Sequence, residues 1–128
     1  NVEASVTRLD WFDPTLTALN IDTSSSDEGG VVIIAGDVIY KSTLVTPFME
    51  TVSTLLTHSP RSVFYLCHIP RGGPRVEYEH VEQAATAQGI SFEVVPEDEW
   101  KRGSCLEEDY VPTEDVSRAR VYIMRATV

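Results

Sequence analysis

The stretch Val31-Val-Ile-Ile-Ala-Gly-Asp-Val-Ile-Tyr40 decides the fold class of this chain. Its first half is an uninterrupted apolar run, and Gly36-Asp37 follows directly. A run without polar alternation is typical of a strand buried on both faces, as in a parallel sheet covered by helices. We therefore predict a buried strand over residues 31–39 in an α/β fold. Ligands bind beyond the carboxyl ends of strands in open α/β sheets, so a site is expected at Asp37 and Tyr40.

Other elements follow from hydrophobic periodicity and turn residues. An amphipathic helix is predicted within Ser42–His58, with Ser42, Thr43 or Thr46 as N-cap, and Pro47 favours a start close to Thr46. The remaining predicted elements are strands at Ala4–Leu9, Ser62–Cys67, Ile90–Val95 and Arg120–Thr127, and a helix over about Val76–Gln88 with Gly89 as its C′ residue. No helix separates the last two strands, so they should pair antiparallel.

The length of 128 residues suits one domain with one core. Residues 20–30 are polar and form a connector, which we expect to be mobile. Residues 97–115 contain eight carboxylates and are predicted to form a long acidic loop. Such a loop is solvated by default, and recruitment of a basic substrate is the alternative.

Composition excludes several classes of function. The net charge is −10 and the basic residues are dispersed, so no nucleic-acid-binding patch is expected. The acidity is compatible with a basic protein partner, or it serves solubility alone. No apolar run approaches the roughly 18 residues of a membrane span, and no signal peptide is visible. Two cysteines without metal-ligand spacing fit a reducing compartment, so we expect a cytoplasmic, or else nuclear, protein.

Two motifs together resemble a known family. Leu9-Asp10-Trp11 is followed, after a polar gap, by Ile34-Ala35-Gly36-Asp37-Val38-Ile39-Tyr40 and a predicted helix. This arrangement resembles the C-terminal half of the family 16 methyltransferases, which are seven-strand, S-adenosylmethionine-dependent enzymes that mostly modify protein lysines. The resemblance covers nearly the whole chain, from the end of the family's third strand to its closing antiparallel strand.

The resemblance also implies what this sequence lacks. The family's sheet has the order 3-2-1-4-5-7-6, and its first two strands carry a Gly-rich turn and an acidic residue that hold the cofactor. Neither feature is found here, because Gly29-Gly30 lacks a following helix and Gly72-Gly73 lies between two prolines. The expected fold is therefore a Rossmann-like methyltransferase fold, of which this chain supplies the C-terminal half without the N-terminal cofactor-binding half.

Site residues carry over from the family position by position. Asp37 would line the acceptor pocket, where a carboxylate orients a lysine ammonium or accepts its proton; a surface carboxylate that caps the next segment is the alternative. Tyr40 would pack beside the departing methyl group, unless it is only an amphipathic residue at a strand end. Asp10, Trp11 and Gly36 would contact the cofactor, with Asp10 at the adenine amino group and Trp11 against its ring. A turn and a core indole remain equally open for Asp10 and Trp11.

The histidines offer no comparable signal. His68 ends a buried strand, and a structural role is favoured over a catalytic one. His58 and His80 are expected on solvated helix faces, and the three are too scattered for a metal site.

The sequence thus predicts methyl transfer from S-adenosylmethionine to a protein side chain, most simply a lysine, within a longer chain. The displacement needs orientation and a deprotonated amine, so no metal is implied. The rival is a non-catalytic, methyltransferase-derived interaction module. Either way we expect self-association through the exposed edge of the strand at residues 31–39.

Overall fold

The computed structural model describes residues 4–14, 30–59, 61–70, 75–102 and 117–127. The elements, in chain order, are β1 (Val32–Gly36), α1 (Ser42–His58), β2 (Val63–His68), α2 (Tyr78–Ala87), β3 (Ile90–Val94), α3 (Glu97–Arg102) and β4 (Arg120–Ala126). The four strands form one mixed sheet in the order β1-β2-β4-β3. β1 is parallel to β2, whereas β4 runs antiparallel to both of its neighbours. The predicted α/β class and the antiparallel pairing of the last two strands are confirmed.

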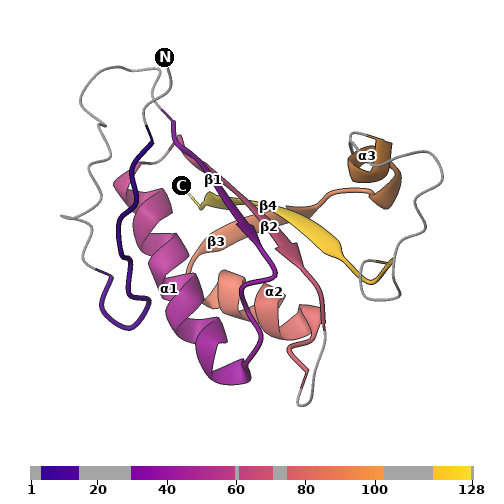
Figure 1. Ribbon diagram of the computed structural model, residues 1–128, viewed down its shortest axis with the longest axis horizontal. Helices are drawn as coiled ribbons and strands as arrows, with labels where there is room; N and C mark the ends of the chain where they lie inside the picture. The colour runs from indigo at the N-terminus through magenta and orange to yellow at the C-terminus, as the bar shows by residue number, and fades with distance from the viewer. Residues whose placement is uncertain (1–3, 15–29, 60, 71–74, 103–116, 128) are drawn as a thin grey trace.

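Two helices cover one face of this sheet. In Figure 1, α1 and α2 lie side by side against the same face, and α3 stands apart beyond the end of β3. The core lies between these layers, and its buried side chains include Phe48, Met49, Leu56, Phe64, Leu66, Val81, Tyr122 and Met124. The apolar residues that recur at helical spacing within residues 42–58 thus form the face by which α1 packs on the sheet.

The strands show that only one face of the sheet is buried. Side chains of β2 alternate, so Phe64 and Leu66 are buried while Tyr65 is exposed. In β1, Val32 and Ile34 are 65% and 78% exposed. The prediction that the strand at 31–39 is buried on both faces is wrong, because both covering helices of the described chain lie on the other side of the sheet.

The strand also ends earlier than predicted. β1 stops at Gly36 because Asp37 adopts a positive φ of 53°, which turns the chain out of the sheet. The Asp37 amide still donates to the Cys67 carbonyl at 2.9 Å, so the ends of the two parallel strands stay together.

The helix at residues 42–58 has the predicted extent but a different start. Its N-cap residue is Lys41, with no side-chain cap hydrogen bond, and Pro47 lies inside the helix. Burial of Val45, one turn ahead of Phe48, extends the apolar face toward the amino end. This packing offsets the cost of the backbone hydrogen bond that is lost because Pro47 has no amide hydrogen. At the second helix, Gly89 has a φ of 69° and its amide donates to the Thr86 carbonyl, which confirms it as the C′ residue.

Two further predictions need correction. Ala4–Leu9 is not a strand: the segment runs beside α1 (Figure 1) and pairs with neither edge strand of the sheet, and Val6 is fully exposed. The acidic loop begins with a helix, α3, since Pro96 precedes it and Glu97, Asp98 and Glu99 occupy its first turn, where acidic side chains favour the helix dipole. Most of the connector at 20–30, the Gly72-Gly73 turn and residues 103–116 lie outside the described residues.

No helix among the described residues is long and apolar enough to cross a bilayer.

Candidate functional site

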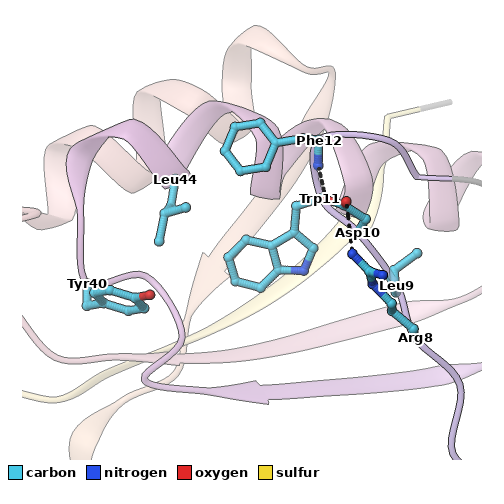
Figure 2. A pocket seen from close by; sticks show the side chains of 7 residues that line it. All are labelled: Arg8, Leu9, Asp10, Trp11, Phe12, Tyr40 and Leu44. Atoms are coloured by element: carbon cyan, nitrogen blue, oxygen red, sulfur yellow. Dashed lines mark hydrogen bonds and ion pairs between the residues drawn. The ribbon is translucent and has the colours of Figure 1, made fainter.

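An open hollow of about 340 Å³ lies between the N-terminal segment and the start of α1. Figure 2 shows its lining: Arg8, Leu9, Asp10, Trp11, Phe12, Tyr40 and Leu44. Three predicted site residues, Asp10, Trp11 and Tyr40, thus border one space, although Tyr40 lies about thirty positions after the other two in the sequence. The volume falls within the range of small-molecule sites, but the hollow is open rather than enclosed. Arg8, Phe12 and Leu44 were not among the predicted site residues, and their only signal in the sequence is adjacency to these motifs.

Trp11 anchors the N-terminal segment to the helical layer. Its indole packs edge-on against Phe48 of α1, with 4.8 Å between ring centroids. Thr51 reinforces this contact, because its hydroxyl lies 3.3 Å from the Trp11 carbonyl and 2.9 Å from that of Pro47. The half-buried Trp11 indole therefore packs against the core and also borders the hollow.

Asp10 stabilises a turn in the N-terminal segment. Its Oδ1 accepts the amide hydrogen of Phe12 at 3.0 Å, and Asp13 donates its amide to the Asp10 carbonyl, so a tight turn follows the Trp11 position. Its Oδ2 lies 3.7 Å from Arg8, in an exposed pair that contributes little to stability. A carboxylate accepts about four hydrogen bonds, so Asp10 retains capacity toward a ligand in the hollow.

Tyr40 lies on the opposite side of Trp11 from Asp10 and Arg8 (Figure 2). Its side chain is 63% exposed, and the Lys41 ammonium stands 5.8 Å from its ring centroid. A half-exposed indole and an exposed phenol ring thus offer two aromatic surfaces at one opening. Flat aromatic ligands are the class of molecule that such a pair suits.

Asp37 and Gly36 do not line this hollow. Asp37 is half-buried in the turn that follows β1, with its amide held by β2. Gly36 borders a different depression on the open face of the sheet. Asp37 is an L-residue in the left-handed region, a conformation that aspartate tolerates better than most residues and that clusters at functional sites.

His68, at the carboxyl end of β2, is 1% exposed. Its Nε2 lies 2.8 Å from the Val76 carbonyl, its ring meets Tyr78 edge-on, and its buried Nδ1 has no hydrogen-bond partner among the described residues. Burial lowers the pKa of His68, against opposing effects of the Val76 hydrogen bond and the Glu77 charge. A neutral His68 that joins β2 to the entry of α2 is the structural role that the sequence favoured. His58 and His80 are exposed, as predicted.

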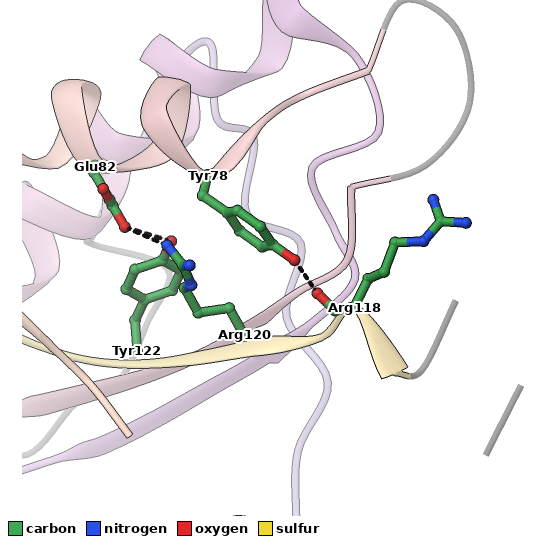
Figure 3. A network of polar contacts seen from close by, with 5 residues as sticks. All are labelled: Tyr78, Glu82, Arg118, Arg120 and Tyr122. Atoms are coloured by element: carbon green, nitrogen blue, oxygen red, sulfur yellow. Dashed lines mark hydrogen bonds and ion pairs between the residues drawn. The ribbon is translucent and has the colours of Figure 1, made fainter. Parts of the chain in front are cut away.

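A polar network next to His68 fixes α2 to β4 (Figure 3). Glu82 Oε1 accepts hydrogen bonds from Arg120 Nη1 and from the buried Tyr122 hydroxyl, both at 3.0 Å. The Arg120 guanidinium lies 3.9 Å from the centroid of the Tyr78 ring, whose hydroxyl donates to the Arg118 carbonyl. Burial, the largest cause, raises the pKa of Tyr122, so its hydroxyl stays protonated.

We expect Glu82→Ala to destabilise the fold by about 1–3 kcal/mol, because it leaves the buried Tyr122 hydroxyl without an acceptor. Chemical denaturation measures this loss. The control, Glu79→Ala on the exposed side of the same helix, should change stability by less than about 0.5 kcal/mol. Adding Tyr122→Phe to Glu82→Ala should recover part of the loss, and a loss unchanged by this second substitution would contradict the hydrogen-bond explanation.

No group of three metal-ligating side chains occurs within the described residues. Neither a family model nor a curated protein matches the chain.

Proposed function

We propose that this chain is part of an S-adenosylmethionine-dependent methyltransferase that acts on a protein side chain, with lysine as the favoured acceptor. The observation that carries the proposal is the sheet order β1-β2-β4-β3 with β4 reversed. Strands four, five, seven and six of the family's sheet follow one another in that order, and the seventh is the antiparallel one. The order cannot be read from the chain sequence of the elements, so it supports the resemblance independently of the motifs.

The hollow at Asp10, Trp11 and Tyr40 supports the proposal further. The cofactor's adenine is flat and carries an exocyclic amino group. Adenine could therefore stack on the Trp11 indole, which Phe48 holds in place from the core, and its amino group could donate to the Asp10 carboxylate, which can accept further hydrogen bonds. The described residues thus fit the adenine end of the cofactor. They offer no Gly-rich turn for the methionine end, which the proposal assigns to a polypeptide segment that precedes these strands in the family.

Within this proposal, Asp37 acts on the acceptor, and Tyr40 contacts both the acceptor and the cofactor. The cofactor supplies an electrophilic methyl group, and the amine must reach it deprotonated and aligned with the bond that breaks. Asp37 is directed by its fixed backbone and accepts the ammonium proton or orients the amine. Tyr40 follows three residues later and is exposed enough to meet both reactants.

Tryptophan fluorescence tests the adenine site. The chain has two tryptophans, so Trp100→Phe leaves Trp11 as the only indole reporter. Stacking on one aromatic ring is worth roughly 1–3 kcal/mol. A dissociation constant of 1 mM requires about 4 kcal/mol. We therefore expect S-adenosylmethionine and adenosine to quench Trp11 weakly, with millimolar or higher dissociation constants.

The control variants separate this site from non-specific binding. Tyr40→Ala should weaken the quenching, and Tyr65→Ala, an exposed tyrosine on the open sheet face, should not. Absence of quenching would contradict the assignment of Trp11 to adenine. Micromolar affinity would contradict the interpretation that the chain holds only part of the cofactor site.

A non-catalytic interaction module is the second candidate function. The observation that favours it is the open, apolar face of the sheet, which enzymes of this architecture keep covered. An intact Asp37 and Tyr40 pair disfavours it.

A further inference from the structure

The sheet face opposite α1 and α2 carries three rows of side chains. The strand register aligns Val32, Val63, Arg125 and Ser91 in the first row, Ile34, Tyr65, Ile123 and Glu93 in the second, and Gly36, Cys67 and Val121 in the third. Seven of these eleven residues are apolar, and they are contiguous across β1, β2 and β4. We call this set of eleven residues the open face. All-parallel sheets are found almost only with both faces covered, and β1 and β2 are the parallel pair of this mixed sheet.

We propose that the open face is the contact surface of a weak homodimer, in which a second copy of this chain packs sheet against sheet. Three properties of the face identify a second copy as the occupant: its charges, its relief and its size.

The charges of the open face are self-complementary. The chain as a whole carries a net charge of −10, which opposes association of two copies. The described residues of the open face include only Glu93 and Arg125 as charged side chains, so the face itself is neutral. Their Oε1 and Nη1 atoms are 3.8 Å apart at the β3–β4 side of the apolar rows. About a two-fold axis, Arg125 of one copy can therefore meet Glu93 of the other.

The relief of the face is self-complementary as well. A hollow of about 410 Å³ is lined by Ile34, Ala35, Gly36, Tyr65, Cys67 and Val121. Gly36 adds no side chain to this hollow, and a Cβ there would meet no atom within 4 Å. At its border the Ile34 side chain is 78% exposed. A protruding isoleucine beside an apolar depression lets each copy fill the hollow of the other, as an isologous interface requires.

The size of the face sets the expected affinity. A standard interface uses about 20–30 residues on each side, so eleven residues provide roughly half of one. The dimer should accordingly be weak, with a dissociation constant in the micromolar range or above. The Cys67 thiol contributes as an apolar group, since burial raises its pKa and keeps it protonated.

Sedimentation velocity of the full chain across a dilution series tests the proposal. The wild-type chain should show a reversible monomer–dimer equilibrium. Ile34→Glu should raise the dissociation constant about 10- to 100-fold, because it buries an unpaired charge in the apolar part of the contact. The matched control is Val94→Glu, since Val94 is 45% exposed on the opposite side of the sheet and should leave the equilibrium unchanged. Circular dichroism verifies that the variants are folded.

Charge reversal identifies the second copy directly. Arg125→Glu alone and Glu93→Arg alone should each weaken the dimer by about tenfold, because two like-charged pairs then face each other. A mixture of these two variants should dimerise at wild-type strength, since each Arg meets a Glu of the other chain. A wild-type chain that stays monomeric, or a mixture that does not recover association, would overturn the proposal and indicate that a different polypeptide covers the face. Neither outcome bears on adenine binding at Trp11, so the proposed function is tested separately.

Discussion

If the proposed methyltransferase function holds, Asp37→Ala should lower methyl transfer by about 10²–10⁴-fold, the range for loss of a positioned proton acceptor. Asp37 sits at the carboxyl end of β1, and its amide is fixed to the Cys67 carbonyl at 2.9 Å. The backbone, rather than a flexible loop, therefore directs the carboxylate. Cofactor affinity should change little, because Asp37 does not border the hollow at Trp11. Methyl transfer to a protein substrate and cofactor binding are measured side by side.

Because Asp37 has a positive φ, alanine at this position changes the backbone strain as well as removing the carboxylate, so a glycine variant is needed as a control. Alanine in the left-handed region costs roughly 1–2 kcal/mol, whereas glycine adopts it freely. Asp37→Gly keeps the backbone and removes the carboxylate, and Asp37→Asn keeps the shape and removes the charge. If the carboxylate acts on the amine, all three variants lose activity, although only Asp37→Ala loses stability. Wild-type rates in Asp37→Gly and Asp37→Asn would mean that Asp37 serves the fold alone.

The elements of the core were predictable because their signals are local. Phe48, Val52 and Leu56 recur at helical spacing and are buried together in α1. Gly89 was placed at the end of the second helix because a left-handed residue is needed there, and its φ of 69° agrees. The antiparallel pairing of β3 and β4 is confirmed, although the prediction assumed that no helix separates them and the short helix α3 lies between them.

The errors arose where the outcome depends on partners elsewhere in space. An apolar run such as Val31–Ala35 has the same sequence signal whether one or two faces of the strand are covered. Ala4–Leu9 has strand-forming residues, but a strand also needs a neighbour. Proximity of Asp10 to Tyr40 could not be derived from the sequence either, because it depends on the packing of Trp11 against Phe48. Only the family resemblance associated these residues in advance.

The stability of the chain should fall as the pH drops below about 6.5, the ordinary pKa of histidine. Burial lowers the pKa of His68 in the folded state, so the unfolded chain binds this proton first. Stability is therefore fully present above the unfolded value and is lost as the pH falls toward the folded one, by at most about 1.4 kcal/mol per pH unit. Urea unfolding at a series of pH values between 5 and 8 measures the slope.

Variants of two histidines isolate this contribution. His68→Gln removes the titration and retains a group that can donate to the Val76 carbonyl, so its stability should be flatter over this pH range whatever its absolute value. His58→Gln, at an exposed helix end, should keep the wild-type slope. Protonation at Nδ1 would create a buried donor without an acceptor among the described residues. The Glu77 carboxylate would attract the resulting positive charge. Arg120, which pairs with His68 in the β2–β4 register, would repel it. Equal slopes in the wild-type chain and His68→Gln would show that His68 is solvated or paired in solution, and that the junction between β2 and α2 is looser than its contacts with Val76 and Tyr78 imply.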